Sequence, residues 1–573
     1  MAVVRLHMFC LVVAIWVCVS SCGASAGQDA GPVVSTVSGK VNGMITHTTD
    51  LPDKPIYTFL GIPYAAPPVG DLRYRPPEPA PPWEGVREAV EYGPYCPQNL
   101  TMLSQLEAPI AFGEDMTMNE DCLTANVYTP TVDPDASLPV LLWIHGGGLM
   151  CFYGSPPGWE AIAAYQDVVV VSFNYRLGVL GFLSTGDENM PGNYGFLDQV
   201  RAMEWVKENI QNFGGDPERV TIFGESAGAI SVSYQLLSPL SKGLFQRAIS
   251  QSGTWKTFPV NPQPLAVTKI IAENAGCEST EDTAILTACL KEKSPEELLD
   301  AFQALGPMAY LVPVVDGTFL TTDPSDLMKN GEINTADYLL GFNNHEGGWM
   351  GLSSFLEGDP HDGITQEEFV KLLKTTMSFI HHSNPNLDKM VDAVVAEYKP
   401  TNPDDPMSIL YQFTHTSGDS YFAAPTILVA ESHTDAGSRV FLYENQYRPS
   451  IHPNKPDWVG CEHGDDLFML WGFPFLEATR TVKAINYSKE DEEVTLEMMA
   501  YWANFARTGD PSDSTGGPTD SPSLPTWPQY TPDNPVYMKL DVVPTTEVGY
   551  KPEKMKLWNE VIPQIAAEKK DEL

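Results

Sequence analysis

The chain has 573 residues, 43% hydrophobic and 19% charged, so it can bury a large core and is not mainly disordered, collagen-like or coiled coil. Its 34 Lys and Arg are outnumbered by 74 Asp and Glu, and the formal charge of −40 argues against a nucleic-acid partner. Nine cysteines are too few for a disulfide scaffold at this length.

Both ends of the chain carry targeting signals. A basic start, an apolar run from Met8 to Val19 and small residues up to Ala26 predict a secretory signal peptide over residues 1–26. Neither this run nor any later one reaches the roughly 20 residues of a spanning helix, so we expect no transmembrane segment. Residues 570–573 read Lys-Asp-Glu-Leu, which a KDEL-type retrieval receptor recognises. We therefore expect residues 27–569 to form a mature protein of the endoplasmic reticulum lumen.

This compartment is oxidising and glycosylating. Asn99 and Asn486 each begin an Asn-x-Ser/Thr sequon, so both are candidate glycosylation sites on exposed loops. The cysteines that remain after the signal peptide are even in number, as a set of disulfides requires.

The first half of the mature chain alternates strand and helix patterns. Pro139–Ile144 and Asp167–Phe173 are short aliphatic runs typical of buried parallel strands. Leu197–Ile210 has apolar residues at helical spacing, and Val220–Phe223 is a third strand pattern. Such alternation predicts a doubly wound α/β sheet.

Further signals complete the outline. Gly214 to Pro217 is expected to separate the helix from the third strand, and Thr365 with Glu368 forms a capping-box pattern that opens another helix. Residues 510–528 are rich in Pro, Ser, Gly and Asp and predict a surface loop. Because composition shifts nowhere strongly and no repeat appears, we expect one large domain.

A nucleophile-elbow pattern follows the third strand. Gly224-Glu225-Ser226-Ala227-Gly228 has small residues where a tight strand-turn-helix leaves no room for larger ones. The pattern alone is weak, but the flanking strand and helix support Ser226 as a candidate nucleophile.

A glycine-rich turn follows the first strand. His145-Gly146-Gly147-Gly148 can point backbone N–H groups at a developing oxyanion. Together with the N–H of Ala227, Gly147 and Gly148 are the candidate oxyanion-hole donors.

A serine nucleophile needs a base and an acid later in the chain. His463 is the preferred base because it lies in a short polar, glycine-flanked stretch before an apolar run. For the acid, Glu346 and Asp316 each follow a strand-like run, and spacing does not choose between them.

These motifs together resemble the type B carboxylesterase/lipase family, the cholinesterase-like α/β-hydrolases. The resemblance covers nearly the whole mature chain and includes the segments 59–65, 119–123, 145–148, 223–228, 250–253, 343–346 and 463–465. It implies an α/β-hydrolase fold, with a large and mostly parallel central sheet flanked by helices.

The resemblance also implies roles for particular residues. The implied catalytic triad is Ser226, Glu346 and His463, with Gly147, Gly148 and Ala227 as the oxyanion hole. The implied family disulfides are Cys96–Cys122 and Cys277–Cys289. Glu225 and Ser252 are candidates for structural support around the triad, and no metal or cofactor is implied.

Differences from the subgroups narrow the function. Residues 97–121 contain no Trp, whereas cholinesterases bind a quaternary ammonium on a tryptophan of that loop. Glu346 as the acid and the retrieval tail favour a microsomal, liver-type carboxylesterase acting on small to medium apolar esters. A neutral-lipid or cholesteryl ester lipase of the bile-salt type is the alternative, and a catalytically idle luminal binding or adhesion-type protein is the alternative from another class.

Two cysteines depart from the family disulfides. Cys151 and Cys461 lie beside the inferred site, and we expect free thiols, with a bridge between them as the alternative. If His463 must be neutral to act, activity should fall as the pH drops through roughly 6 to 7.

Overall fold

The computed structural model describes residues 30–99, 117–278, 280–306, 309–348, 356, 359–381, 384–451, 455–476 and 485–568. The expected signal peptide and the expected retrieval tail lie outside the described residues. Among the described residues, no helix is both long enough and apolar enough to cross a membrane.

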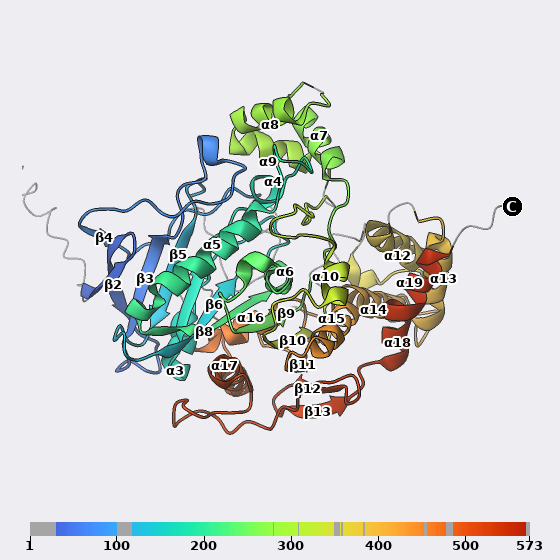
Figure 1. The fold of residues 1–573 in the computed structure, drawn as a ribbon. Coiled ribbons are helices and arrows are strands. Elements are labelled where there is room, and N and C mark those ends of the chain that lie inside the picture. Colours follow the sequence, from blue (N-terminus) through green and yellow to red (C-terminus); the bar gives the residue numbers. More distant parts are fainter. Residues whose placement is uncertain are drawn as a thin grey trace, which may run out of the picture.

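The centre of the molecule is a mixed sheet of 13 strands (Figure 1). The strands are β1 (Ala30–Thr36), β2 (Gly39–Thr46), β3 (Ile56–Pro63), β4 (Val86–Glu88), β5 (Thr124–Thr129), β6 (Leu138–Ile144), β7 (Val169–Phe173), β8 (Gly215–Glu225), β9 (Arg247–Gln251), β10 (Asp337–Asn343), β11 (Val440–Asn445), β12 (Val536–Leu540) and β13 (Thr545–Val548).

Helices follow most of the central strands. The α-helices are α3 (Trp159–Gln166), α4 (Gly178–Gly181), α5 (Tyr194–Asn209), α6 (Ala227–Gln235), α7 (Pro264–Asn274), α8 (Thr283–Glu292), α9 (Pro295–Gln303), α10 (Pro324–Asn330), α12 (Gln366–Ile380), α13 (Leu387–Glu397), α14 (Pro406–Gly418), α15 (Ala424–Asp435), α16 (Asp465–Leu470), α17 (Lys489–Thr508), α18 (Pro552–Lys556) and α19 (Ile562–Ala567). Shorter helical turns are η1 (Gly70–Leu72), η2 (Ile210–Phe213), η3 (Pro239–Ser241), η4 (Pro360–Asp362), η5 (Asp419–Ala423), η6 (Phe473–Phe475) and η7 (Leu557–Val561).

The sheet has a parallel centre and antiparallel flanks. Its order is β1-β2-β3-β5-β7-β6-β8-β9-β10-β11-β12-β13, with β4 paired to β2. The strands from β7 to β12 pair in parallel, whereas β1, β2, β3, β5 and β13 join their neighbours along this order antiparallel. Parallel strands end at one edge of a sheet, so loops that are distant in sequence meet there.

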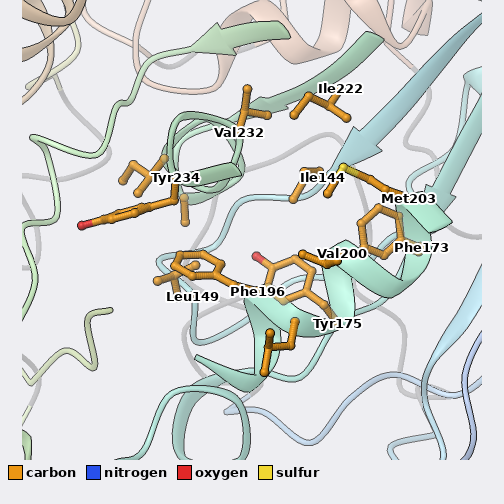
Figure 2. Close-up of a cluster of buried hydrophobic side chains, with 14 of the residues drawn as sticks. Ile144, Leu149, Phe173, Tyr175, Phe196, Val200, Met203, Ile222, Val232 and Tyr234 are labelled. Atoms are coloured by element: carbon orange, nitrogen blue, oxygen red, sulfur yellow. The ribbon is translucent and has the colours of Figure 1, made fainter. Parts of the chain in front are cut away.

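Both faces of the parallel strands are buried under helices. Along β6, Leu142 and Ile144 contribute to one hydrophobic core, and the alternating Leu141 and Trp143 contribute to a second. Helices α5 and α6 cover the first face, and α3 and α17 cover the second (Figure 1). Figure 2 shows the first core, where α5, α6 and the sheet bring their aliphatic and aromatic side chains together. Burial on both faces explains why these strands read as continuous apolar runs rather than as alternating ones.

Most of the predicted elements are confirmed. Strands β6 and β7 match the two aliphatic runs, and α5 buries the apolar residues that predicted it. The capping box is present, because the Thr365 side chain accepts from the N–H of Glu368 and the Glu368 side chain accepts from the N–H of Thr365. Helices α12, α13, α14 and α19 pack around a separate small core (Figure 1).

One boundary was predicted incorrectly. Gly214 does end the helical stretch in a left-handed conformation, but β8 begins at Gly215 instead of Val220. Gly215 already pairs with Leu138 of β6, and a register irregularity before Val220 hides the strand's start from a pattern of apolar residues.

Candidate active site

Ser226 stands at a strained junction between β8 and α6. Its backbone has φ 56° and ψ −123°, a region that residues with a side chain rarely adopt. The junction is also tight, because a Cβ added to Gly228 would lie 2.1 Å from the carbonyl oxygen of Ile144. This crowding explains the glycine in the elbow. Because β8 ends at Glu225, the serine lies at the carboxyl edge of the sheet.

The structure brings Ser226, His463 and Glu346 together. His463 Nε2 lies 2.8 Å from Ser226 Oγ, and His463 Nδ1 lies 2.7 Å from Glu346 Oε2. Glu346 follows β10, and His463 lies in the loop between β11 and α16. The three side chains therefore come from loops that follow three parallel strands.

Glu346 is held from its other side. Its Oε1 accepts the backbone N–H of Asn343 at 2.7 Å and the hydroxyl of Ser252. Asp316, the competing acid, accepts the N–H groups of Thr318 and Leu320 within its own turn. The geometry thus selects Glu346 as the partner of His463.

A second carboxylate faces the histidine. Glu225 Oε1 lies 3.3 Å from His463 Nε2, and Glu225 is only 6% exposed. Burial raises the pKa of Glu225 to about 8. Burial alone would lower the pKa of His463, but the charges of Glu225 and Glu346 outweigh it and raise this pKa to about 10. The two groups are coupled, because a proton on Glu225 removes charge that favours a proton on His463.

The glycine-rich turn lies beside the serine. A Cβ added to Gly146 would be 3.2 Å from Ser226 Cβ. Gly147 and Gly148 have φ of 93° and 64°, and their N–H groups donate no hydrogen bond to the described part of the chain. Ala227 is the first residue of α6, where backbone N–H groups have no partner within the helix. These three N–H groups therefore remain the candidate donors to an oxyanion.

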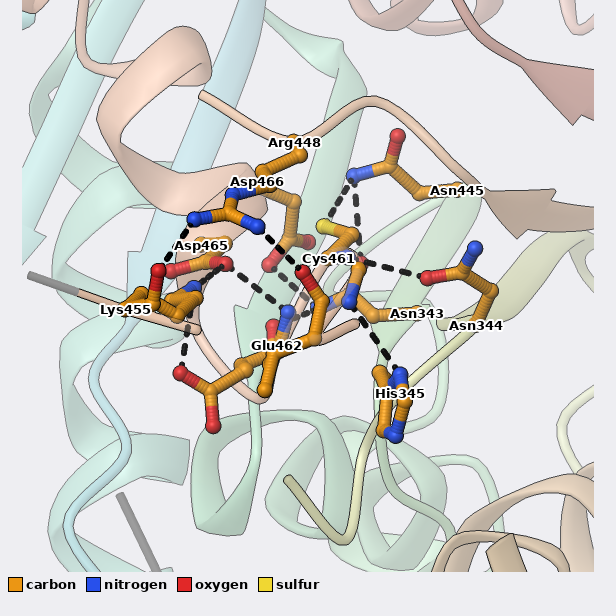
Figure 3. Close-up of polar contacts among 12 residues, drawn as sticks. Asn343, Asn344, His345, Asn445, Arg448, Lys455, Cys461, Glu462, Asp465 and Asp466 are labelled. Carbon is orange, nitrogen blue, oxygen red and sulfur yellow. Dashed lines mark hydrogen bonds and ion pairs between the residues drawn. The ribbon is translucent and has the colours of Figure 1, made fainter. Parts of the chain in front are cut away.

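The loop after β10 that carries Glu346 (the acid loop) is joined by hydrogen bonds to the loop between β11 and α16 that carries His463 (the base loop) (Figure 3). The sequence patterns did not predict these hydrogen bonds. Cys461 N–H donates to Asn344 Oδ1 at 2.9 Å, and His345 N–H donates to the carbonyl of Cys461 at 2.9 Å. Asn343 Nδ2 donates to the carbonyl of Glu462 at 2.7 Å. A signal was present in the sequence, because Asn343, Asn344 and His345 form a polar run at the end of an apolar strand.

The cysteines divide into two disulfides and two thiols. Cys96–Cys122 and Cys277–Cys289 are bonded, with Cα atoms 5.1 and 6.0 Å apart. The remaining two cysteines of the described chain, Cys151 and Cys461, are buried and free. Cys151 Sγ donates to the carbonyl of Gly147 at 3.4 Å, and Cys461 Sγ accepts from Asn445 Nδ2 at 3.1 Å.

The glycosylation candidates differ in exposure. Asn486 is exposed and Asn99 is half-buried. Within the ranges that the structure describes, no group of three His, Cys, Asp or Glu side chains could hold a metal ion.

Comparison with known proteins decides the family. A sequence model of the Carboxylesterase family matches residues 30–558. The chain belongs to this family. It is 37% identical to the liver carboxylesterase of Sus scrofa over 93% of this chain and 94% of the relative. It is 38% identical to carboxylesterase 1D of Rattus norvegicus, with 93% and 94% covered. It is 36% identical to the medium-chain fatty acyl-CoA hydrolase precursor of Anas platyrhynchos, with 90% of each chain covered.

Membership of this family establishes the fold and the general activity of the protein. The 13-stranded sheet with helices on both faces is an α/β-hydrolase fold. The protein is accordingly a carboxylic ester hydrolase, similar to liver carboxylesterases.

Proposed function

We propose that the protein hydrolyses carboxylic esters through an acyl-enzyme intermediate, with Ser226 as nucleophile, His463 as base and Glu346 as the orienting acid. The continuous hydrogen-bonded chain of 2.8 and 2.7 Å from Ser226 through His463 to Glu346 carries this proposal.

The mechanism follows from the direction of that chain. Ser226 Oγ attacks the ester carbonyl while His463 Nε2 takes the hydroxyl proton, and the buried Glu346 stabilises the imidazolium through Nδ1. The N–H groups of Gly147, Gly148 and Ala227 bind the oxyanion. His463 then protonates the leaving alcohol, and a water molecule attacks the acyl-enzyme by the same steps to release the acid.

The substrate class is proposed to be small to medium apolar esters. Liver carboxylesterases among the relatives support ester substrates, and the medium-chain acyl-CoA hydrolase of Anas platyrhynchos supports acyl groups of medium length. A neutral-lipid lipase uses the same chemistry and differs in the acyl and alcohol parts of the ester that it accepts.

The test compares p-nitrophenyl acetate, butyrate and palmitate, and medium-chain acyl-CoA, on the purified protein. Ser226→Ala should abolish hydrolysis and labelling by a fluorophosphonate, whereas Ser233→Ala on the same helix should keep both. Fastest turnover of palmitate would favour the lipase instead. A folded wild type without turnover and without labelling would refute the catalytic proposal and favour a luminal binding protein.

We further propose residence in the endoplasmic reticulum lumen, supported by the signal-peptide pattern and the Lys-Asp-Glu-Leu tail at residues 570–573. Deleting residues 570–573 should release the protein into the medium of expressing cells. Retention of the truncated protein would contradict a role for the retrieval receptor.

A further inference from the structure

A buried cluster of charges surrounds the backbone of the base loop. Lys455, Glu462 and Asp465 have side chains that are 2%, 2% and 0% exposed. Figure 3 shows the three side chains converging beside Asp466 and the loop that connects them. Burying three charges is costly, so their contacts need a physical reason.

The ammonium of Lys455 bridges Glu462, directly before His463, and Asp465, two residues after it. Its Nζ contacts the Asp465 carboxylate and lies 3.0 Å from Glu462 Oε2. Glu462 N–H donates to Asp465 Oδ2 at 2.8 Å, which closes a turn over residues 462–465. His463 is the second residue of this turn, so the bridge fixes the backbone on both sides of the histidine.

The other end of the loop is fixed by a second cation. The Arg448 guanidinium donates to the carbonyls of Lys455 and Val459 at 2.6 and 3.0 Å. The backbone of Lys455 is therefore held in place, and its side chain extends from this fixed point to Glu462 and Asp465. Burial disfavours the charged amine, but Asp465 and Glu462 outweigh burial and hold the pKa of Lys455 above its ordinary value.

We propose that Lys455 is a positioning residue for ester hydrolysis, whose bridge between Glu462 and Asp465 holds His463 Nε2 within hydrogen-bond distance of Ser226 Oγ. This inference rests on the proposed function. Lys455 contacts neither Ser226, His463 nor Glu346 among the contacts that the structure records. It acts through the shape of the loop, and a small displacement of a catalytic base is enough to slow the reaction strongly.

The expected effect is on turnover and not on substrate binding. Replacing Lys455 by Met removes the cation between two buried carboxylates, so their repulsion opens the turn that carries His463. We expect kcat to fall about tenfold to about a hundredfold, while KM stays within about twofold.

The pH profile gives a second readout. His463 already faces carboxylates from three elements, namely Glu225 of β8, Glu346 after β10 and Asp466 of α16. Without the ammonium, Glu462 and Asp465 add negative potential near the imidazole, which favours its protonated form. The acid limb of kcat/KM should therefore move to higher pH in Lys455→Met.

The control is Arg73→Met. Arg73 forms an ion pair with Glu120, both side chains are poorly exposed, and neither residue contacts the triad among the contacts that the structure records. It should lower the melting temperature and leave kcat and the pH profile unchanged. If Lys455→Met does not fold, Asp465→Asn tests the same bridge with a neutral side chain of the same shape, and a smaller fall in kcat at constant KM is expected.

Two results would overturn the inference. One is a kcat within about twofold of wild type in Lys455→Met or, where that variant does not fold, in Asp465→Asn. The other is an equal kcat loss in Arg73→Met at the same fall in melting temperature, since general destabilisation would then suffice. Failure of the proposed function is distinguishable, because wild type and Arg73→Met would then show no turnover that depends on Ser226.

Discussion

Replacing Glu225 by Gln should move the acid limb of the activity profile to lower pH. Glu225 Oε1 lies 3.3 Å from His463 Nε2, and its charge favours the imidazolium, which cannot act as a base. Glutamine keeps the shape of the side chain and removes the charge. Because the pKa of His463 is raised in the folded protein, His463 becomes neutral only as the pH rises. Without the charge of Glu225 this pKa should be lower, so the variant should become active at a lower pH.

The size of the shift follows from the distance. At 3.3 Å, Coulomb's law gives about 1.3 kcal/mol with the dielectric constant of water and about 5 kcal/mol with an effective constant of about 20. The His463 side chain is 31% exposed, so screening by water favours the lower figure. Since about 1.4 kcal/mol corresponds to one pKa unit, we expect a shift of at least about one pH unit.

The assay is kcat/KM for a soluble ester from about pH 5 to about pH 10, followed by pH-stat titration of the released acid. Ser252→Ala serves as a comparison, because it also removes a contact of the triad but leaves every charge near His463 in place. An acid limb that does not move in Glu225→Gln, or that moves to higher pH, would refute the electrostatic reasoning.

Three further predictions concern the glycine-rich turn, the core and the thiols. A Cβ at Gly147 would lie 2.1 Å from the carbonyl oxygen of Cys151, so Gly147→Ala should lower kcat about a hundredfold. Gly317 also has a left-handed φ but has open space around it, so Gly317→Ala should leave kcat unchanged. Trp502 is fully buried between α17 and the sheet, and Trp502→Ala should lower the free energy of unfolding by about 3 to 5 kcal/mol in urea denaturation; a loss below about 1 kcal/mol would contradict its place in the core. Thiol titration of the denatured, unreduced mature protein should find the two thiols of Cys151 and Cys461, and a count of zero would indicate a bridge between them.

Local sequence was sufficient to place the framework of the site. The strand before Ser226, the glycine turn after β6 and the capping box before α12 each depend on residues within one segment. Their signals are steric, because only small residues fit a tight turn, or periodic, because one face of a helix is buried. The family resemblance added the triad, since the motifs occur in one order along the chain.

Spacing did not decide between Glu346 and Asp316, because the choice depends on which strands are neighbours. The sheet places β10 beside β9 and β11, so the loop after β10 meets the loop that carries His463. The Asp316 carboxylate instead accepts hydrogen bonds from the backbone of its own turn.

The sequence by itself determined the fold class, the elbow and the glycine-rich turn of this carboxylesterase, because these follow from local sterics and burial. Only the tertiary structure decided the electrostatics of the base. The carboxylate of Glu225 beside His463, and the bridge from Lys455 to Glu462 and Asp465, join residues whose distances depend on how distant segments pack. Charge interactions depend on distance and solvent exposure, and both quantities are set by the folded structure rather than by the local sequence.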